Sequence, residues 1–168
     1  MFEEIKIKDL SFNVFDKIGK EWMLITAGTV EKHNAMTASW GNLGVLWHKP
    51  VATVYVRPQR FTKTFLDKED FFTISFYDES KKDALLFYGQ NSGKDIDKDS
   101  KTNFVAKSFD RSVAFEEADL VFVCKKTFCD QMNPNKILNK TIIKDIYENN
   151  DFHYIYIGEI VAVFKKVK

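Results

Sequence analysis

A short run that follows an apolar segment carries three cationic side chains and one hydroxyl. The run RPQRFTK, residues 57–63, contains Arg57, Arg60, Thr62 and Lys63 directly after VATVYV. Thr62 is a credible N-cap of a short helix, and the free N–H groups of such a helix, together with the cations, favour a phosphate. The alternative is a solvated charged turn, and composition and spacing alone do not decide between the two.

A second run combines small side chains with polar ones. Residues 34–40 read NAMTASW, in which asparagine, threonine and serine are separated by two alanines. Small side chains allow a ligand to approach the backbone, and the hydroxyl groups add hydrogen-bonding capacity. The same pattern fits one strand of an ordinary hairpin, so this run is a candidate binding site that needs support from elsewhere in the chain.

Two other groups of residues do not support the chemistry that they superficially suggest. The stretch GQNSGKD, residues 89–95, has its glycines too close together for a nucleoside triphosphate loop, and Asp95 stands where a magnesium-binding hydroxyl is needed. Cys124 and Cys129 are a lone pair, for which two reduced thiols are the simplest interpretation. Neither group predicts a catalytic side chain.

The three histidines, His33, His48 and His153, are far apart in the sequence. None has partners at metal-ligand spacing, so no metal site is expected. His153 follows Asp151 in a strand-like run, where it is either a half-buried imidazole or a polar group at the edge of a ligand pocket.

The elements that must position these residues are mostly strands. Apolar and β-branched runs predict strands at residues 21–30, 35–40, 51–56, 71–77, 112–115, 118–130 and 152–167, the last interrupted and bent at Gly158. Gly28 predicts a bulge or a close approach. Short helices are expected at 61–70 and 79–88, the second capped by Ser80, and a polar loop at 89–102. This order favours a closed or nearly closed barrel over an open parallel sheet.

Length and composition agree with a compact β protein. The 168 residues predict one domain over residues 1–168, with enough chain for a core that needs no disulfide. A net charge of +1 disfavours a nucleic-acid partner or a polybasic membrane clamp. Aromatic residues make up 15% of the chain, which suits a β-rich core or a flat ligand. The sequence shows no membrane span or signal peptide pattern, so a cytoplasmic protein is expected.

Several of these runs, taken in order, resemble the flavin reductase-like proteins of the FMN-binding split-barrel fold. The matching runs are LITAGTVEKHNAMTASWGNLGVLWHKPVATVYVRPQRFT (24–62), FFTISFY (71–77), NSGKDIDK (91–98) and DFHYIYIGEIVAV (151–163). The resemblance implies a mainly β, FMN-binding split β-barrel of Greek-key topology, with six or more antiparallel strands and a few short flanking helices. It covers roughly residues 20–165.

The resemblance also implies a homodimer that binds FMN near the subunit interface. By matching position, the isoalloxazine and the ribityl chain would be lined by Asn34, Met36, Thr37, Ala38, Ser39 and Trp40. The phosphate would be held by Arg57, Arg60, Thr62 and Lys63, within a run that also includes Pro58 and Gln59. The polar loop would approach the flavin from either subunit through Ser92, Gly93, Lys94, Asp97 and Lys98. Trp40 and Trp47 depart from the usual pattern and would form a ring-stacking wall.

The resemblance implies two possible functions. The first is a flavin reductase that takes hydride from NAD(P)H and passes it through FMN to an acceptor, with no protein acid or base. The second is an FMN-binding electron-transfer protein that exchanges electrons with a protein partner and has no nicotinamide site. No sequence motif identifies a contact for the nicotinamide, so the sequence leaves both open.

Overall fold

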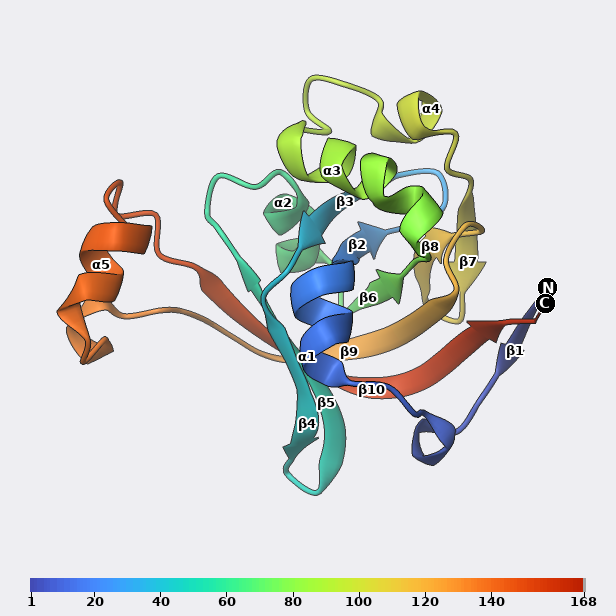
Figure 1. Cartoon of the computed structure of the whole chain (residues 1–168), viewed down its shortest axis with the longest axis horizontal. Coiled ribbons are helices and arrows are strands. Elements are labelled where there is room, and N and C mark those ends of the chain that lie inside the picture. The colour runs from blue at the N-terminus through green and yellow to red at the C-terminus, as the bar shows by residue number, and fades with distance from the viewer. Residues whose placement is uncertain (168) are drawn as a thin grey trace.

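The computed structural model describes residues 1–167, and its main element is an eight-stranded antiparallel sheet that curls on itself (Figure 1). The strands of this sheet are β1 (Phe2–Glu4), β2 (Met23–Gly28), β3 (His33–Ala38), β4 (Gly41–Leu46), β5 (Lys49–Val56), β6 (Phe71–Phe76), β9 (Leu120–Gln131) and β10 (Tyr154–Lys166). They lie in the order β3-β2-β6-β9-β10-β5-β4, and β1 pairs with β10 outside this path. The mainly β barrel of six or more strands predicted from the sequence is confirmed.

Short helices and one small hairpin surround the sheet. They are α1 (Val14–Asp16), which continues into a wide turn (Lys17–Glu21), α2 (Thr62–Lys68), α3 (Lys82–Gln90), α4 (Lys98–Thr102), α5 (Lys140–Ile146), the hairpin of β7 (Ala106–Phe109) and β8 (Ser112–Phe115), and tight turns at Ile7–Asp9, Glu79–Lys81 and Pro134–Lys136. Figure 1 shows α3 and α4 over one end of the barrel, whereas α5 lies on an arm that projects away from it. No helix among residues 1–167 is long and apolar enough to cross a membrane.

The barrel is open between β3 and β4. These strands are the two edges of the sheet, although only residues 39–40 separate them in the sequence. In the sheet, β3 pairs with β2 alone and β4 pairs with β5 alone. An edge strand presents backbone N–H and C=O groups that are not used by a neighbouring strand, so this split offers hydrogen-bonding groups to a ligand.

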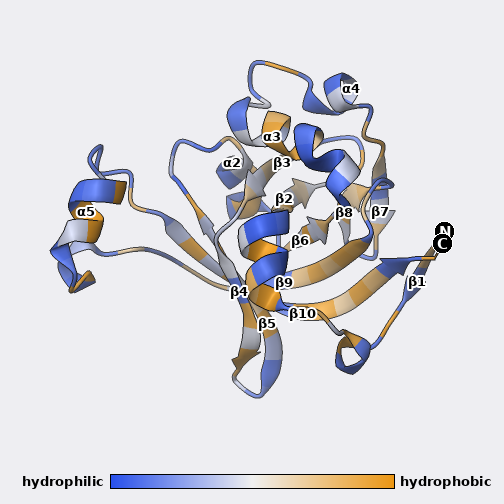
Figure 2. Ribbon diagram, viewed as in Figure 1, coloured by the Kyte–Doolittle hydropathy of each residue, from blue (hydrophilic) through white to orange (hydrophobic). Residues whose placement is uncertain are grey.

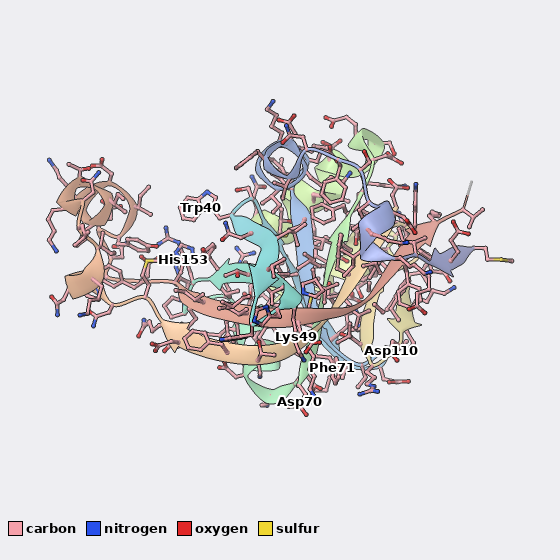
Figure 3. All side chains as sticks on the ribbon, turned by 90° about the horizontal axis from the view of Figure 1, so that it is seen from below. Trp40, Lys49, Asp70, Phe71, Asp110 and His153 are labelled. Atoms are coloured by element: carbon pink, nitrogen blue, oxygen red, sulfur yellow. The ribbon has the colours of Figure 1, made fainter. Side chains whose placement is uncertain are left out.

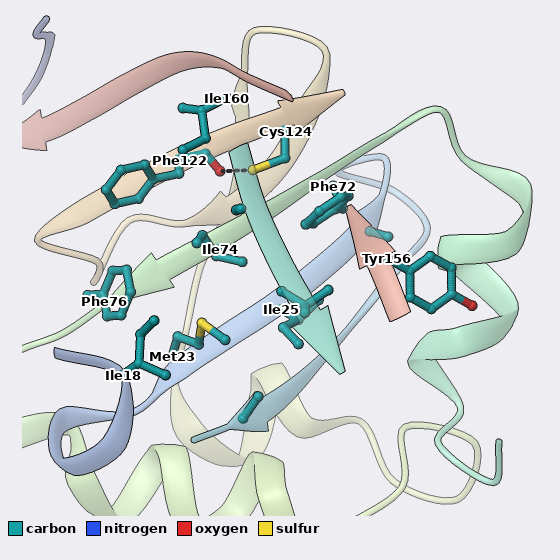
Figure 4. Packing of buried hydrophobic residues seen from close by; sticks show 14 of the residues in the cluster. Ile18, Met23, Ile25, Phe72, Ile74, Phe76, Phe122, Cys124, Tyr156 and Ile160 are labelled. Atoms are coloured by element: carbon teal, nitrogen blue, oxygen red, sulfur yellow. Dashed lines mark hydrogen bonds between the residues drawn. The ribbon is translucent and has the colours of Figure 1, made fainter. Parts of the chain in front are cut away.

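Alternation along the strands separates two hydrophobic clusters. Ile25 and Phe72 point into the barrel, where large apolar side chains fill the interior (Figure 4). Leu24 points to the opposite face, where Leu85 and Tyr88 of α3 cover the sheet. Because successive side chains of a strand face opposite sides, the same strands supply both clusters. Figure 2 shows the corresponding apolar bands along the strands.

Gly28 and Gly158 are among the glycines at which any side chain would collide with the structure. Gly28 has φ +121°, and a Cβ there would lie 2.3 Å from the carbonyl oxygen of Lys32, which is the close approach predicted for it. A Cβ on Gly158 would lie 2.7 Å from Phe72 and 2.8 Å from Cys124. The register between β10 and β9 shifts at this position, but β10 continues through it. The predicted interruption is therefore wrong, and the irregularity is a bulge.

Each of the seven predicted strand segments overlaps a strand of the structure, but both predicted helix caps are wrong. The N-cap position of α2 is Phe61, and the Thr62 hydroxyl instead accepts a hydrogen bond from Asn34. The turn before α3 is capped by Asp78, whose carboxylate accepts from the Ser80 N–H at 2.8 Å. The N-cap position of α2 is therefore one residue earlier than predicted, and a tight turn at Glu79–Lys81 precedes α3.

Candidate functional site

A groove made of three adjoining cavities follows the split between β3 and β4. The cavities have volumes of about 180, 260 and 530 Å³. Arg60 lines both of the first two, and Trp40, Tyr55 and His153 line both of the last two. Figure 3 shows Trp40 and His153 close together, and their ring centroids are 5.3 Å apart. The shared residues show that the three cavities adjoin one another along the groove.

The smallest cavity lies between the start of α2, the end of α3 and the loop before α4, and we call it the cationic end. It is lined by Asn34, Gln59, Arg60, Phe61, Thr62, Gln90, Asn91, Ser92, Gly93 and Lys98. Of these residues, only Arg60 and Lys98 carry a charge, and both charges are positive. A cavity with two cations and no carboxylate in its lining favours an anionic ligand.

Arg60 is held by the last turn of α3. Its Nη1 donates to the carbonyl oxygen of Gly89 at 2.7 Å, and its Nη2 donates to that of Tyr88 at 3.3 Å. Carbonyl groups at a helix C-terminus carry partial negative charge and so orient a cation, but they do not neutralise it. Arg60 is part-buried, and this burial lowers its pKa from the ordinary value.

Lys98 is almost fully buried, with 4% of its surface exposed. Its ammonium group donates to the carbonyl oxygen of Ala35, and to that of Asn91 at 3.4 Å. Burial and then the charge of Arg60 lower the pKa of Lys98 to about 8, against an opposing effect of Asp99. An anion between Lys98 and Arg60 would relieve both the desolvation and the mutual repulsion.

Asn34, Thr62 and Gly93 close the floor of the cationic end. The Asn34 amide donates to the Thr62 hydroxyl at 2.6 Å, and both side chains are buried. A Cβ on Gly93 would lie 1.8 Å from the Asn34 Oδ1. The loop therefore approaches β3 so closely that only glycine fits at position 93.

A carboxylate beside Lys98 ties α4 to the rest of the molecule. Asp99 is 2.7 Å from the Nε2 of His33 on β3, and its other oxygen accepts from the Tyr88 hydroxyl of α3 at 2.7 Å. Burial disfavours the charged form of His33, but hydrogen bonds and the charge of Asp99 outweigh it, so the pKa of His33 is raised. These contacts fix the position of the neighbouring Lys98.

The second cavity, which we call the middle of the groove, is walled by β3 and by the end of β5. It is lined by Met36, Thr37, Ala38, Ser39, Trp40, Tyr55, Arg57, Arg60 and His153. Met36 and Ala38 direct their side chains into the barrel core, and the Thr37 hydroxyl donates to the carbonyl oxygen of Leu85. This stretch of β3 therefore offers its backbone edge, rather than its side chains, to a ligand.

Arg57 borders the middle of the groove but is already paired. Its Nη1 lies 2.5 Å from the Asp151 carboxylate, and its Nη2 donates to the carbonyl oxygen of Ile146 at 3.0 Å. Gln59 also donates to Asp151, at 2.7 Å. Asp151 thus neutralises Arg57 and fastens the arm that carries α5 to the rim of the groove.

The largest cavity, which we call the aromatic end, lies between α1, the start of β4 and the arm. It is lined by Val14, Phe15, Ile18, Gly19, Ser39, Trp40, Gly41, Asn42, Leu43, Tyr55, Met132, Tyr147 and His153. No aspartate, glutamate, lysine or arginine of residues 1–167 is among them. The Tyr55 hydroxyl donates to the Asn42 side-chain oxygen at 2.8 Å, so part of the polar lining is already paired.

His153 stands at the boundary between the middle and the aromatic end. Its Nδ1 is 2.8 Å from the Tyr147 hydroxyl, whereas its Nε2 has no hydrogen-bond partner among residues 1–167. Burial and then the charge of Arg57 lower the pKa of His153 to about 4, although Asp151 opposes this. His153 is therefore neutral at physiological pH and offers one free ring nitrogen to the groove.

The structure brings most of the predicted site residues to the groove. Those that line the cationic end or the middle are Asn34, Met36, Thr37, Ala38, Ser39, Trp40, Arg57, Gln59, Arg60, Thr62, Ser92, Gly93 and Lys98. Four others do not. Lys63 pairs with Asp67 at 2.7 Å, and Pro58 lines none of the three cavities. Lys94 and Asp97 line a further cavity beside His33, which borders the cationic end through Asn34, Gly93 and Lys98.

Several groove residues were not predicted from the sequence. They are Tyr55, Phe61, Gln90, Asn91 and the lining of the aromatic end that α1 and the arm supply. Tyr55 could have been predicted, because it lies between the buried Val54 and Val56 on β5 and therefore points out of the barrel. No group of three or more potential metal ligands occurs among residues 1–167.

Comparisons with known proteins identify related sequences and folds. The sequence model described as the flavin reductase like domain matches residues 15–166. No curated protein sequence matches. An FMN-binding protein from Thermus thermophilus, solved with bound p-hydroxybenzaldehyde, is 21% identical with a TM-score of 0.67, over 86% of this chain and 71% of that one. Flavoredoxin from Methanosarcina acetivorans is 19% identical with a TM-score of 0.70, over 98% of this chain and 76% of that one. An NADH:FAD oxidoreductase from Streptomyces globisporus, in complex with NAD and FAD fragments, is 15% identical with a TM-score of 0.64, over 87% of this chain and 74% of that one.

Proposed function

This chain belongs to the flavin reductase-like family, and from that premise we propose that it binds FMN in the groove and acts as an NAD(P)H-dependent oxidoreductase. The observation that carries the proposal is the pair of cations at the cationic end, the part-buried Arg60 and the buried Lys98, which donate to backbone carbonyl oxygens and have no carboxylate beside them in the lining of that cavity. The groove continues from that pair along a free strand edge, which suits a ligand with an anionic tail and a flat polar head.

Arg60 and Lys98 fit the phosphate of FMN. Each donates only to backbone carbonyl oxygens, and burial lowers the pKa of each. A phosphate dianion accepts several charge-assisted hydrogen bonds, so it would replace the hydration that the two cations have lost. The buried Thr62 hydroxyl and the loop around Gly93 complete the cavity on its other sides.

The middle of the groove fits the isoalloxazine ring. The polar edge of that ring carries N–H and C=O groups in its plane, and the free edge of β3 presents backbone groups of the same kind. Ala38 and Ser39 are small enough to leave the backbone accessible, and Trp40 stands beside them with 47% of its surface exposed. The ring would lie against residues 36–40, with the ribityl chain leading to Arg60.

The bound FMN would supply the hydride and electron-transfer chemistry, and the chain would bind it and exclude competing reactions. His153 stays neutral in the physiological range, so it would hold a hydrogen bond at the edge of the ring without adding charge. No side chain in the groove needs to act as a general acid or base.

We also propose a homodimer, for which the projecting arm supplies the surface. Leu138 and Ile142 on this arm have 92% and 41% of their surfaces exposed, and Trp47 at the tip of the β4–β5 hairpin has 55% exposed. Apolar side chains on projections of this kind are typical of protein–protein interfaces.

Titration of the purified protein with FMN tests the cofactor. We expect one FMN per chain, a change in the flavin absorbance bands, and a melting temperature that rises with FMN concentration. A protein that binds no FMN and is not stabilised by it would contradict the proposal. Light scattering tests the dimer, which a stable monomer would exclude.

Anaerobic mixing of the FMN-loaded protein with NADH or NADPH separates the two functions. Bleaching of the flavin band within turnover times supports the reductase. Absence of bleaching with both nucleotides, in protein that is reduced by dithionite, would favour an electron-transfer protein that receives its electrons from another protein.

A further inference from the structure

His33 lies beside the cationic end but outside its lining, and both of its ring nitrogens face hydrogen-bond acceptors. Its Nδ1 is 3.0 Å from the carbonyl oxygen of Thr29 and 3.1 Å from that of Val30, and its Nε2 is 2.7 Å from a carboxylate oxygen of Asp99. Carbonyl and ionised carboxylate oxygens accept hydrogen bonds and cannot donate them. An imidazole satisfies both sides only when both nitrogens carry a proton, so the geometry selects the charged form of His33.

The second oxygen of Asp99 also has a fixed partner. It accepts from the Tyr88 hydroxyl at 2.7 Å. Burial and then the charge of Asp99 raise the pKa of Tyr88, so this hydroxyl keeps its proton and donates. The main-chain carbonyl of Tyr88 accepts from Arg60 at 3.3 Å. Asp99 therefore links His33 on β3 to the turn of α3 that holds Arg60.

The start of α4 depends on these contacts for its position. The helix is five residues long, and a helix of this length is not stable without tertiary contacts. The buried Phe104 anchors the chain just after its end. At its start, Lys98 donates to the carbonyl oxygen of Ala35, and Asp99 contacts His33. The position of the Lys98 ammonium group is therefore sensitive to the state of the pair formed by His33 and Asp99.

The same pair sets the charge beside Lys98. Burial and Arg60 lower the pKa of Lys98, and the negative charge of Asp99 opposes them, so Asp99 and Lys98 interact. When His33 is protonated, its charge balances that of Asp99. When His33 loses the proton, an unbalanced carboxylate faces the Nε2 lone pair and stands next to the proposed phosphate site. Deprotonation therefore weakens the contact that holds α4 and adds negative charge where an anion is to bind.

Other charged groups surround His33, but the ion pair that His33 makes within residues 1–167 is with Asp99. Those that line the same cavity are Glu31 and Lys32 from the turn before β3, and Lys94, Asp95, Asp97 and Lys98 from α4 and the loop before it. From β8, the neighbour is the uncharged ring of Phe115, with ring centroids 5.7 Å apart. Because the pKa of His33 is raised from its ordinary value of 6.5, the protonated pair is complete below pH 6.5 and is lost as the pH rises through the raised pKa.

We propose that His33 is a positioning residue for Lys98, acting through Asp99, and that its protonated form holds Lys98 where it binds the FMN phosphate. FMN affinity then follows the protonation of His33, and bound FMN favours the proton on His33 by the same factor. This inference rests on the proposed function for the identity of the ligand. The competing explanation is an ion pair that only stabilises the fold.

Titration with FMN tests the proposal in the parent chain and in His33→Gln, from about pH 6 to about pH 9, a range that spans the titration of an imidazole. The ratio of the two affinities at each pH cancels the titration of the FMN phosphate itself. We expect His33→Gln to bind FMN about fivefold more weakly at the acid end and within about twofold of the parent at the alkaline end. Lys32→Gln removes an exposed cation from the same turn, and its ratio should be the same at every pH.

The Lys98→Met background shows whether His33 acts through Lys98. Positioning requires that adding His33→Gln to this variant change FMN affinity by less than about twofold at every pH. If the pH-dependent loss survives in Lys98→Met, His33 acts on the phosphate directly and the inference is overturned. It is also overturned if the ratio for His33→Gln in the parent chain does not change with pH, which is the result expected of a purely structural ion pair.

NMR spectroscopy of the free chain tests the same pair without FMN. The ring signals of His33, assigned with His33→Gln, should titrate with a midpoint above 6.5, and Asp99→Asn should lower this midpoint by about one unit. The backbone amide signals of Gly93 and Lys98 should follow the same midpoint in the parent chain and not in His33→Gln. A midpoint that Asp99→Asn leaves unchanged, or amide signals that do not follow it, would contradict the inference. If FMN does not bind but the amide signals follow His33, the positioning of Lys98 stands and the proposed ligand is wrong.

Discussion

The cationic end and the aromatic end belong to one groove, yet the charges of their lining residues differ. At the cationic end, Arg60 and Lys98 remain charged although burial lowers the pKa of both. At the aromatic end, none of the residues 1–167 that line the cavity is a lysine, arginine, aspartate or glutamate, and burial lowers the pKa of His153 to about 4. The cationic end is lined by Asn34 of β3 and the aromatic end by Gly41, Asn42 and Leu43 of β4, so each end adjoins a different edge of the split. The difference shows that the fold supplies the position, and that the segments packed over each end decide the chemistry.

A second contrast lies among the cations themselves. Arg57 and Lys63 belong to the same short run as Arg60, but each is paired with a carboxylate, at 2.5 Å and 2.7 Å respectively. Arg60 has only carbonyl partners. Three cations that look equivalent in the sequence therefore differ in the structure, because two are paired with carboxylates and Arg60 donates to backbone carbonyl oxygens.

The largest effect should come from removing the unpaired cation. Arg60→Ala is expected to weaken FMN by about 100-fold, since a buried charge-assisted contact to the phosphate is lost, and to change riboflavin binding little. Fluorescence titration with both flavins measures the difference. Lys63→Ala removes a cation of the same run and should leave both affinities within about twofold. Equal losses for FMN and riboflavin in Arg60→Ala would contradict the assignment of the phosphate.

The next effect is the pH dependence of FMN binding. The pKa of Lys98 is about 8 in the free protein, and a bound phosphate would raise it. Above pH 8 the free protein has lost this proton and binding must take one up, so FMN affinity should fall by up to about tenfold per pH unit. Riboflavin has no phosphate, and its affinity should stay flat.

Lys98→Met provides the control for this titration. The variant should bind FMN more weakly at neutral pH and lose the alkaline fall in affinity, because no ammonium remains to titrate. An unchanged pH profile in Lys98→Met would show that another group is responsible.

A pair of glycine substitutions compares the room for an added side chain at the two ends. A Cβ at Gly93 would meet Asn34 at 1.8 Å, so Gly93→Ala should displace the loop and weaken FMN about tenfold. A Cβ at Gly19, in the aromatic end, has no heavy atom within 4 Å. Gly19→Ala should therefore leave FMN affinity unchanged and alter stability by less than about 1 kcal/mol. Similar behaviour of the two variants would mean that the close contact at Gly93 does not matter for binding.

The smallest effect concerns the floor of the cationic end. Thr62→Val removes the hydroxyl that accepts from Asn34 and leaves the amide only a 3.4 Å contact to the carbonyl oxygen of Ala35. Urea denaturation should show a loss of about 1 kcal/mol. Thr64 lies exposed on the same helix, and Thr64→Val should cost less than about 0.5 kcal/mol. Equal losses in the two variants would mean that the buried hydrogen bond is not what stabilises this floor.

The strands could be predicted from the sequence because their apolar alternation is local. The run VATVYV lies wholly within β5, and FFTISF makes up β6. The edge strand β4 was not predicted, because GNLGVL contains two glycines and has low β-strand propensity. Its pairing with β5 stabilises it as a strand. Helix α5 was also missed, although Asn139 caps it by accepting from the Thr141 N–H at 3.1 Å.

The site was predictable only in part, because charge neutralisation depends on distant residues. Asp151 pairs with Arg57 from the far end of the chain, and nothing in the run RPQRFTK signals that contact. The placement of Lys98 in the groove followed from the family resemblance, whereas its burial followed from the packing of α4 on β3 and α3. The aromatic end could not be predicted from the sequence, because α1, β4 and the arm come together only in the folded chain.

A crystal structure of the full chain with FMN tests the central claim most directly. The account predicts the phosphate within hydrogen-bond distance of both Arg60 and Lys98, and the ring against the free edge of β3 at residues 36–40. A phosphate held in solvent or by Lys63, or a ring inside the cavity lined by Phe15, would contradict it.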